Sequence, residues 1–371
     1  MNHDIIASMQ QEIIDLLAKL SHIPAPSNHE ERRALFIHDW LADNGIPSVI
    51  DEVQNVVVSY GEGPSFDVIA AHTDVVFPDE NELVQKWENG RLYCPGSGDD
   101  TANVVLMLLC LKSMKENHIQ PKRPLLFVAN SGEEGLGNLK GIRNICKNYE
   151  GRIHSFTSFD GCVGHVVVRA VGSKRYRLSV RTKGGHSYAD FGEPNAIAEA
   201  AGIITALYHI GIVPKGSATY NVGTIMGGTS INSIAQDCEF TFEFRSVSEG
   251  QLAKLEQLFK DTIQKLKHPN AVVSVEEIGN RPCGKEDIPG KDAMVAFAKK
   301  CILQNSGIIA GNASSSTDCN IPLSLGIPSV CFGLVKGAGA HTRQEYVELD
   351  SLESGFRLGY AYLTGMATGS A

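Results

Sequence analysis

Two different periods of apolar residues follow one another along this chain, and the change falls near residue 172. Before it, helical spacing of apolar residues predicts helices over 4–20 and 28–44. The second of these has Asn28 as its expected N-cap and Gly45 as its expected stop. The first part of the chain is therefore expected to contain amphipathic helices that cover a core.

Short apolar runs lie between these helices and further loops. Runs of this length bounded by Gly, Pro and charged residues are typical of buried strands, while a longer apolar stretch is compatible with a buried helix. Strand, charged turn, helix and strand in succession indicate a doubly wound α/β layer. The expected strands cover 53–60, 66–71 and 125–130, and the expected buried helix covers 104–111.

The middle of the chain has another pattern. Residues 175–182 alternate between polar and apolar, as a half-exposed antiparallel strand does. The segments that follow complete the order strand, helix, strand, strand, helix, strand, which is the ferredoxin-like order. The expected helices are 194–210, with Pro194 in the first turn, and 248–268, and the further strands are 219–225, 238–245 and 272–278.

The α/β pattern returns at about residue 281. The simplest architecture is one α/β domain interrupted by a smaller α+β insertion. We therefore expect one domain made of 1–172 and 283–371, and an inserted domain made of 173–282.

Composition narrows the class of protein. With 33 Lys and Arg against 42 Asp and Glu, the net charge is −9, which disfavours nucleic acid as a partner. The chain has neither a membrane-span pattern nor a signal-peptide pattern. Its nine scattered cysteines do not suggest a disulfide framework, and Cys110 and Cys331 lie in apolar runs, so we expect them to be buried. We expect a soluble cytoplasmic enzyme or binding protein.

Five loops carry acidic residues or histidine next to expected strands or helices, where α/β enzymes place their sites. Each loop alone has an ordinary explanation as a core histidine, a helix N-terminus or a solvated turn. The loops are AHTDVV (His72, Asp74), GSGDDT (Asp99, Asp100), NSGEEG (Glu133, Glu134), SFDG (Asp160) and GAHT (His341).

Taken together, the five loops favour a metal centre. The two carboxylates of an adjacent pair repel each other, and two such pairs at strand ends cost stability unless a cation neutralises them. Imidazoles and carboxylates form a ligand set that suits zinc, and cobalt or manganese as well. One carboxylate can bridge two metals about 3.5–4 Å apart, and a carboxylate that binds no metal can act as a general base.

The order HTD…GDD…EE…DG…H resembles the M20 family of co-catalytic zinc peptidases and deacylases, which includes peptidase T, carnosinases and the acetylornithine and succinyl-diaminopimelate deacylases. The resemblance extends over nearly the whole chain. It implies a catalytic domain of the zinc-peptidase type, with a mixed central sheet flanked by helices, interrupted by a ferredoxin-like lid and dimerisation domain. It also implies two Zn²⁺ per subunit, with Co²⁺ or Mn²⁺ as alternatives, and a homodimer.

The resemblance also implies a role for each matched residue. Glu133 corresponds to the general base, and Asp74 to the acid that orients the imidazole of His72. The peptide bond between Asp99 and Asp100 corresponds to one that is cis in the family. The implied metal ligands are His72 and Asp160 for the first metal, Glu134 and His341 for the second, and Asp99 for both.

Three residues of the insertion have implied roles. In GGHSYADFGEPNAI, His186 resembles a histidine that reaches the active site of a partner subunit and donates to the developing oxyanion. Asn232 and Arg245 resemble residues that hold a substrate carboxylate. Each residue also has an alternative without a function. His186 could be a surface histidine in a Gly-rich turn, Asn232 could be a turn residue, and Arg245 could belong to a salt bridge at a strand edge. The sequence departs from the family pattern at Thr101, where lysine is common, and in the serine-rich loop before Asp318.

The resemblance implies metal-assisted hydrolysis of an amide bond. Because Asp160 stands where aminopeptidases and dipeptidases tend to have Asp, we expect an aminopeptidase or di- or tripeptidase that acts on short peptides. The alternative enzyme is an N-acyl-amino-acid deacylase of the acetylornithine or succinyl-diaminopimelate type. The alternative of another class is a metal-free binding protein that retains the fold. A dehydrogenase is disfavoured because no GxGxxG follows the first strands.

Overall fold

The computed structural model describes residues 3–210, 218–266 and 270–369. Its contacts divide the chain into two compact units. The first unit comprises Met1–Ala170 and Lys285–Ala371, and the second comprises Val171–Gly284. Each unit has its own hydrophobic core, so each is described by itself.

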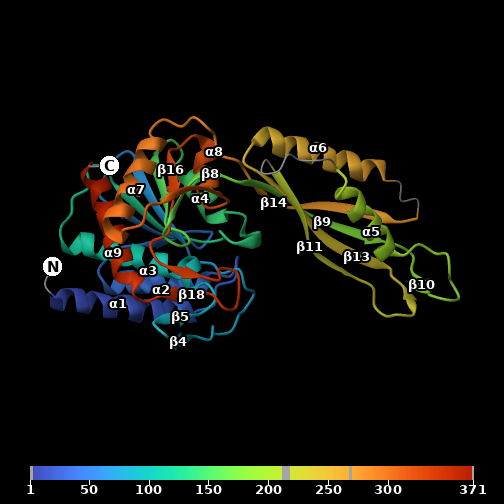
Figure 1. The fold of residues 1–371 in the computed structure, drawn as a ribbon, viewed down its shortest axis with the longest axis horizontal. Helices are drawn as coiled ribbons and strands as arrows, with labels where there is room; N and C mark the ends of the chain where they lie inside the picture. Colours follow the sequence, from blue (N-terminus) through green and yellow to red (C-terminus); the bar gives the residue numbers. More distant parts are fainter. Residues whose placement is uncertain (1–2, 211–217, 267–269, 370–371) are drawn as a thin grey trace. The chain divides into compact units, whose positions relative to one another are not determined.

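An eight-stranded mixed sheet forms the centre of the first unit (Figure 1). Strand β3 pairs in parallel with β6 on one side and β7 on the other, and β7 pairs in parallel with β16. Antiparallel pairs join β1 to β2, β2 to β6 and β16 to β8. In spatial order the strands are β1 (Val49–Ile50), β2 (Val56–Tyr60), β6 (Leu125–Asn130), β3 (Phe66–His72), β7 (Ile153–Ser158), β16 (Ser329–Cys331), β8 (His165–Ala170) and β15 (Gly311–Ser315).

Helices cover both faces of this sheet, which explains why its central strands are apolar throughout. In β3, Ile69 and Ala71 pack into one core cluster, while Val68 and Ala70 pack into the other, because successive side chains point to opposite faces. The first cluster is covered by α1 (His3–His22), α2 (Glu31–Asp43), α3 (Ala102–Glu116), α7 (Lys291–Ser306) and α9 (Ser351–Thr368), and the second by α4 (Lys140–Asn148) and α8 (Asn320–Leu325).

A smaller four-stranded sheet and two short turns complete the first unit. Its strand order is β17-β18-β5-β4, and every pairing in it is antiparallel. Its bounds are β4 (Lys86–Glu88), β5 (Arg91–Tyr93), β17 (Gly337–Ala338) and β18 (Tyr346–Glu348), and the turns are Ser97–Thr101 and Gly135–Gly137.

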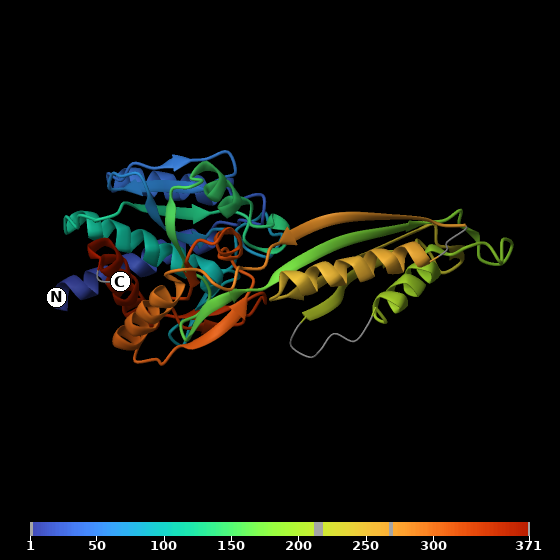
Figure 2. The ribbon, with the colours of Figure 1, turned by 90° about the horizontal axis from the view of Figure 1, so that it is seen from above.

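The second unit is a four-stranded antiparallel sheet with two helices packed on one face (Figure 2). Aromatic residues of β13 point into the core between the sheet and the helices, and Phe242 stacks on Phe259 at 5.7 Å between ring centroids. The elements are β9 (Gly172–Arg181), α5 (Ala196–Leu207), β11 (Ala218–Gly227), β13 (Asp237–Ser246), α6 (Glu249–Lys265) and β14 (Val272–Arg281), with the sheet order β11-β13-β9-β14. A two-stranded pair, β10 (Gly185–His186) with β12 (Ser233–Ile234), lies outside this sheet.

The predicted fold class, an α/β domain with a mixed sheet and an α+β insertion, is confirmed. The strand predicted over 125–130 is β6 itself, and the predicted buried helix is the centre of α3. Cys110 and Cys331 are buried as expected. All nine cysteines belong to the described residues, and each is a free thiol.

Two predicted helix starts are wrong. Asn28 does not cap α2: its φ is +76°, and its N–H donates to the side chain of Glu30, the residue that directly precedes the helix. Pro194 lies before α5 rather than in its first turn, because Asn195 caps the helix by accepting the N–H groups of Ile197 and Ala198.

Other expectations on the elements have mixed outcomes. Gly45 ends α2 as predicted, with a φ of +66°. The β10/β12 pair was not expected, since each of its strands has two residues. The predicted helix 248–268 is found as α6 up to Lys265, and its expected last two residues lie outside the described ranges. No helix within the described residues combines the length and the apolar character needed to cross a membrane.

Candidate metal centre

The predicted site residues of the first unit gather at one edge of its large sheet. His72 is the last residue of β3, and Asp160 follows the end of β7. Glu133 and Glu134 follow the end of β6. Because β3, β6 and β7 run in parallel, their carboxyl ends meet at the same edge, where α/β proteins place their ligands.

The side chain of Asp99 lies between the two histidines. One of its carboxylate oxygens is 3.1 Å from Nε2 of His72, and the other is 3.3 Å from Nε2 of His341. The same His341 nitrogen is 2.9 Å from Oε1 of Glu134. Residues that are far apart in the sequence therefore converge around the carboxylate of Asp99.

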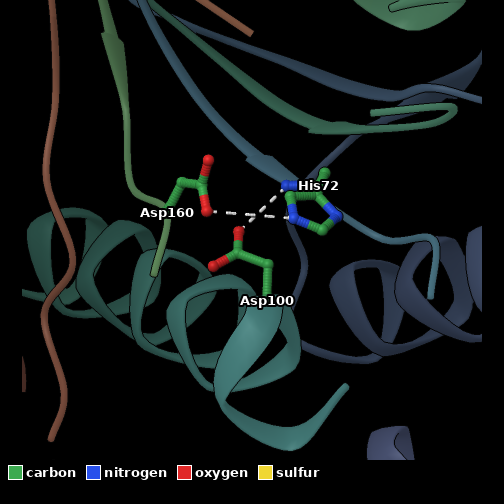
Figure 3. A group of neighbouring side chains, drawn as sticks. All are labelled: His72, Asp100 and Asp160. Carbon is green, nitrogen blue, oxygen red and sulfur yellow. Dashed lines mark hydrogen bonds and ion pairs between the residues drawn. The ribbon is translucent and has the colours of Figure 1, made fainter. Parts of the chain in front are cut away.

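Potential ligand atoms from these side chains form three overlapping groups, and within each group the atoms lie within 4.8 Å of one another. Figure 3 shows the first group, in which Oδ1 of Asp160 is 4.0 Å from Nε2 of His72. The three groups are His72 with Asp100 and Asp160, His72 with Glu133 and Glu134, and Asp99 with Glu134 and His341.

The two adjacent acids Asp99 and Asp100 differ in their partners. The carboxylate of Asp100 accepts the backbone N–H of His72 at 3.0 Å (Figure 3) and the side-chain amide of Asn103 at 2.6 Å. It is therefore already hydrogen bonded to the protein, whereas the carboxylate of Asp99 faces the two imidazoles. The peptide bond between these acids is cis, as the family resemblance implied.

Asp74 is fully buried and organises the turn after β6. Its Oδ1 accepts the backbone N–H of Glu133 at 2.9 Å, and its Oδ2 accepts that of Glu134 at 2.8 Å. Ser27 also donates its hydroxyl to Oδ2 at 2.6 Å. Nδ1 of His72 is 3.1 Å from the backbone oxygen of Asp74 and 3.5 Å from Oδ1. Asp74 thus contacts both the histidine and the acidic turn.

The charged groups of the site shift one another's pKa values. Burial tends to raise the pKa of Asp99, but hydrogen bonds from His341 and His72 outweigh it and hold that pKa well below its usual range. Asp99 and Glu134 raise the pKa of His341 to about 10. Burial, with help from Asp99, raises the pKa of Asp160 well above its usual value. Burial tends to lower the pKa of His72, but the carboxylates of Asp74 and Asp99 outweigh it and hold that pKa well above its usual value. Positive charge on the two imidazoles thus offsets part of the negative charge of the clustered carboxylates.

These residues fit a pair of divalent cations. The donor set is made of imidazole nitrogens and carboxylate oxygens, which suits zinc and similar metals. Asp99 has one oxygen facing each histidine, as a bridging carboxylate requires. A cation would replace the imidazole protons as the balancing positive charge, so metal binding should release protons.

The candidates in the second unit fall into two places. His186 and Asn232 come together, since β10 pairs His186 with Ser233 and the backbone oxygen of Asn232 accepts the N–H of Ser187 at 3.0 Å. The ring of His186 is exposed, and its Nδ1 accepts the N–H of Tyr188 at 3.2 Å.

Arg245 lies apart from that pair. It is eight residues along β13 from Asp237, a rise of roughly 27 Å. It pairs in register with Ser173, the second residue of β9. Its Nε is 2.9 Å from Oε1 of Glu243. Arg245 therefore forms a salt bridge within its strand, which is the structural role that the sequence left open beside substrate binding.

Some residues that support the site were not predicted. Arg33 is fully buried and donates to the backbone oxygen of Thr73 at 2.8 Å and to the hydroxyl of Thr101 at 3.1 Å. Its position in the sequence could have indicated this role, because Arg33 lies four residues before Ile37 and therefore on the buried face of α2. Glu345, in the loop after His341, accepts several backbone N–H groups and had no comparable signal.

Comparisons of the sequence with known proteins found a family and relatives that it resembles. Residues 68–364 match the model of peptidase family M20/M25/M40. The acetylornithine deacetylase of Myxococcus xanthus is 28% identical over 338 residues, which are 84% of this chain and 83% of that protein.

Solved structures share the fold over nearly the whole chain. A tripeptidase from Staphylococcus aureus has a TM-score of 0.74 at 23% identity, covering 97% of this chain and 99% of that one. A dinuclear metal binding peptidase from Bacillus subtilis has a TM-score of 0.63 at 15% identity, covering 96% and 98%.

Proposed function

Because this chain belongs to peptidase family M20/M25/M40 and is a hydrolase of that family, we propose that its site holds two divalent cations and hydrolyses the amide bond of short peptides. The observation that carries the proposal is the carboxylate of Asp99, which faces His72 with one oxygen and His341 with the other. In this proposal Asp160 completes the first metal site and Glu134 the second. Zinc suits these donors best, with cobalt or manganese as alternatives.

The proposed mechanism assigns the proton transfers to Glu133. Bound cations of this kind polarise a carbonyl and lower the pKa of water, so that hydrolysis proceeds near neutral pH. Glu133 would accept the proton of the attacking water and then deliver it to the leaving amine. Asp74 would hold Glu133 in place through its backbone N–H, at 2.9 Å. Glu133 is buried, so its carboxylate contacts little bulk water.

The substrate that we propose is a free di- or tripeptide, cleaved from its amino end. Two observations support this choice. Residue 160 is Asp, as the position tends to be in aminopeptidases and dipeptidases of the family, and the fold is similar to that of a tripeptidase. The second candidate is an N-acyl amino acid, and it is favoured by the similarity to the Myxococcus xanthus acetylornithine deacetylase. Both substrates present an amide bond and a carboxylate, so the same centre serves either.

We further propose that residues 173–282 form a lid and dimerisation domain of a cytoplasmic homodimer. One observation supports a second copy: His186 and Asn232 lie together beside β12, whose last residue precedes Asp237 by three residues, while Arg245 lies roughly 27 Å along β13 from Asp237. One small substrate cannot contact all three residues of the same chain. His186 and Asn232 would therefore serve the centre of the partner, where His186 donates to the oxyanion, and Arg245 would bind the substrate carboxylate.

A substrate panel tests this function. The metal-loaded protein is incubated with free tripeptides, free dipeptides and N-acetylated amino acids, and released amines are measured. We expect turnover of free peptides, and loss of that turnover after chelation of the metal. Turnover of acetylated substrates alone would replace the peptidase by the deacylase. A folded protein that takes up no divalent metal would instead support the metal-free binding protein.

A further inference from the structure

Glu345 is a buried acid next to the proposed metal centre, and the mechanism above does not use it. It lies in the loop between β17 and β18, four residues after His341. Its residue is only 2% exposed. A buried carboxylate is costly unless it is hydrogen bonded, so its partners show what it does.

Those partners are three backbone N–H groups of a single turn. Oε2 of Glu345 accepts the N–H of Gly96 at 2.8 Å. Oε1 accepts the N–H of Gly98 and that of Asp99, each at 2.8 Å. The acid therefore holds the turn that carries Asp99, and one bond is made to the backbone of Asp99 itself.

The backbone of Glu345 is fixed from the other side. Its N–H donates to the oxygen of Thr342 at 3.2 Å, and its own oxygen accepts the N–H of Cys94 at 3.1 Å. The N–H of Thr342 donates to Gly339 at 2.9 Å, so the short loop around His341 is internally hydrogen bonded. Glu345 consequently joins the loop of His341 to the turn of Asp99.

This junction bears on the geometry of the metal centre. One carboxylate oxygen of Asp99 lies 3.3 Å from Nε2 of His341, and each of the two residues is positioned by a loop that Glu345 contacts. We propose that Glu345 is a positioning residue, which fixes Asp99 relative to His341 and so determines the affinity of the second metal. This inference rests on the proposed two-metal function.

Another contact supports the same turn but does not join the two loops. The hydroxyl of Thr101 donates to the backbone oxygen of Gly96 at 2.6 Å, and Arg33 donates to that hydroxyl at 3.1 Å. Arg33 and Thr101 therefore hold the turn against the first helices and strand β3. With Glu345 replaced, the turn would keep this support, so we expect the protein to fold while its second metal site loosens.

The test compares Glu345→Gln with a matched control, Asp67→Asn. Glutamine has the same shape as glutamate, but it presents one acceptor oxygen, and its NH₂ group would face an amide N–H. Asp67 is also buried, and it accepts the hydroxyl of Ser155 at 2.6 Å. It lies at the opposite end of β3 from His72, roughly 17 Å away, so its replacement disturbs a buried acid without touching the centre.

Each metal-free protein is titrated with Zn²⁺ by calorimetry, and its thermal unfolding is recorded without metal. We expect Glu345→Gln to bind the second metal, which Glu134 and His341 would hold, about ten- to 100-fold less tightly than the wild type, and Asp67→Asn to bind both metals as the wild type does. Glu345→Asp, which keeps the charge but has a shorter reach, should lose less affinity than Glu345→Gln, and it serves as the test if Glu345→Gln fails to fold.

The outcomes separate this inference from the proposed function. A wild-type protein that binds fewer than two metals would contradict the two-metal function. A wild-type protein that binds two metals, together with folded Glu345 variants whose affinities match that of Asp67→Asn, would overturn the positioning role alone.

Discussion

The carboxylate of Asp74 accepts the backbone N–H of Glu134 at 2.8 Å. Its other oxygen accepts the N–H of the preceding residue, Glu133, at 2.9 Å. One buried side chain at the end of β3 thus sets the position of a turn at the end of β6, and that turn carries both the proposed general base and a proposed metal ligand. The contact links two strand ends that the sequence separates by about sixty residues.

Replacement of Asp74 by Asn should therefore impair both functions of the turn. An amide has one acceptor oxygen and directs an NH₂ group towards a backbone N–H, so one of the two bonds is lost. We expect about a ten- to 100-fold loss of metal affinity and of kcat/KM, measured by Zn²⁺ titration and steady-state kinetics. Unchanged values in a folded Asp74→Asn protein would contradict this role.

Replacement by glutamine should have different effects at the adjacent residues Glu133 and Glu134, on kcat in the first case and on metal binding in the second. Glu133→Gln removes the proposed general base, so kcat should fall about 10²- to 10⁴-fold while two metals still bind. Glu134→Gln weakens the contact that His341 shares with it at 2.9 Å, so the second metal should be lost first. Metal content and kcat are measured for both variants. Equal metal loss in the two variants would contradict the division of roles.

The stability of the second unit should depend on pH through Glu256. Burial tends to raise its pKa, but Lys174, 2.8 Å away, and Lys260 outweigh it and lower that pKa to about 2. Its ordinary value is 4.5. The lowered pKa stabilises the folded chain above pH 4.5, and this stabilisation is lost as the pH falls from about 4.5 to about 2.

Denaturant unfolding of the full chain and of Glu256→Gln measures this effect. We expect the variant to be roughly 1–2 kcal/mol less stable at pH 6, after allowance for solvent screening, and the difference to shrink towards pH 2. Glu276→Gln is the control, because the side chain of Glu276 is 64% exposed and its ion pair with Arg177 should contribute little. A difference that does not change with pH would contradict the assignment to Glu256.

Replacement of two glycines by alanine should change the stability of the chain in opposite directions. A Cβ at Gly333 would lie 2.0 Å from the backbone oxygen of Gly161, next to Asp160, so Gly333→Ala should destabilise the chain by about 1–3 kcal/mol. A Cβ at Gly202, which is exposed on α5, meets nothing within 4 Å. Gly202→Ala should stabilise the chain by about 0.4–1 kcal/mol. Thermal unfolding of both variants checks these signs.

The sequence predicted the parts of the fold that depend on local pattern. The apolar run 125–130 is β6 because both faces of that strand are buried, and the stripe of α1 buries Ile13 and Leu16. The edges of elements were less predictable, since they depend on tertiary contacts. Asparagine is a residue type that is favoured at N-caps, yet the N–H of Asn28 donates to the side chain of Glu30, and the helix begins after Glu30.

The candidate site was predictable where chemistry recurs in a recognisable order. His72, Asp99 and His341 could be named because histidine and paired acids stand out next to apolar runs, and the structure brings them together. Glu345 could not be named, since a lone acid in a loop resembles a solvated residue until its three N–H partners are known. The separation of Arg245 from Asn232 also depends on the register of β13, which local pattern does not determine.

The central claim is that His72, Asp99, Glu134, Asp160 and His341 surround two cations. A crystal structure of the zinc-loaded protein, with anomalous data collected at the zinc edge, tests it directly. We predict two anomalous peaks about 3.5–4 Å apart, with the carboxylate of Asp99 between them. A fully loaded crystal with no peak at these side chains, or with a single peak that Asp99 does not contact, would contradict the account.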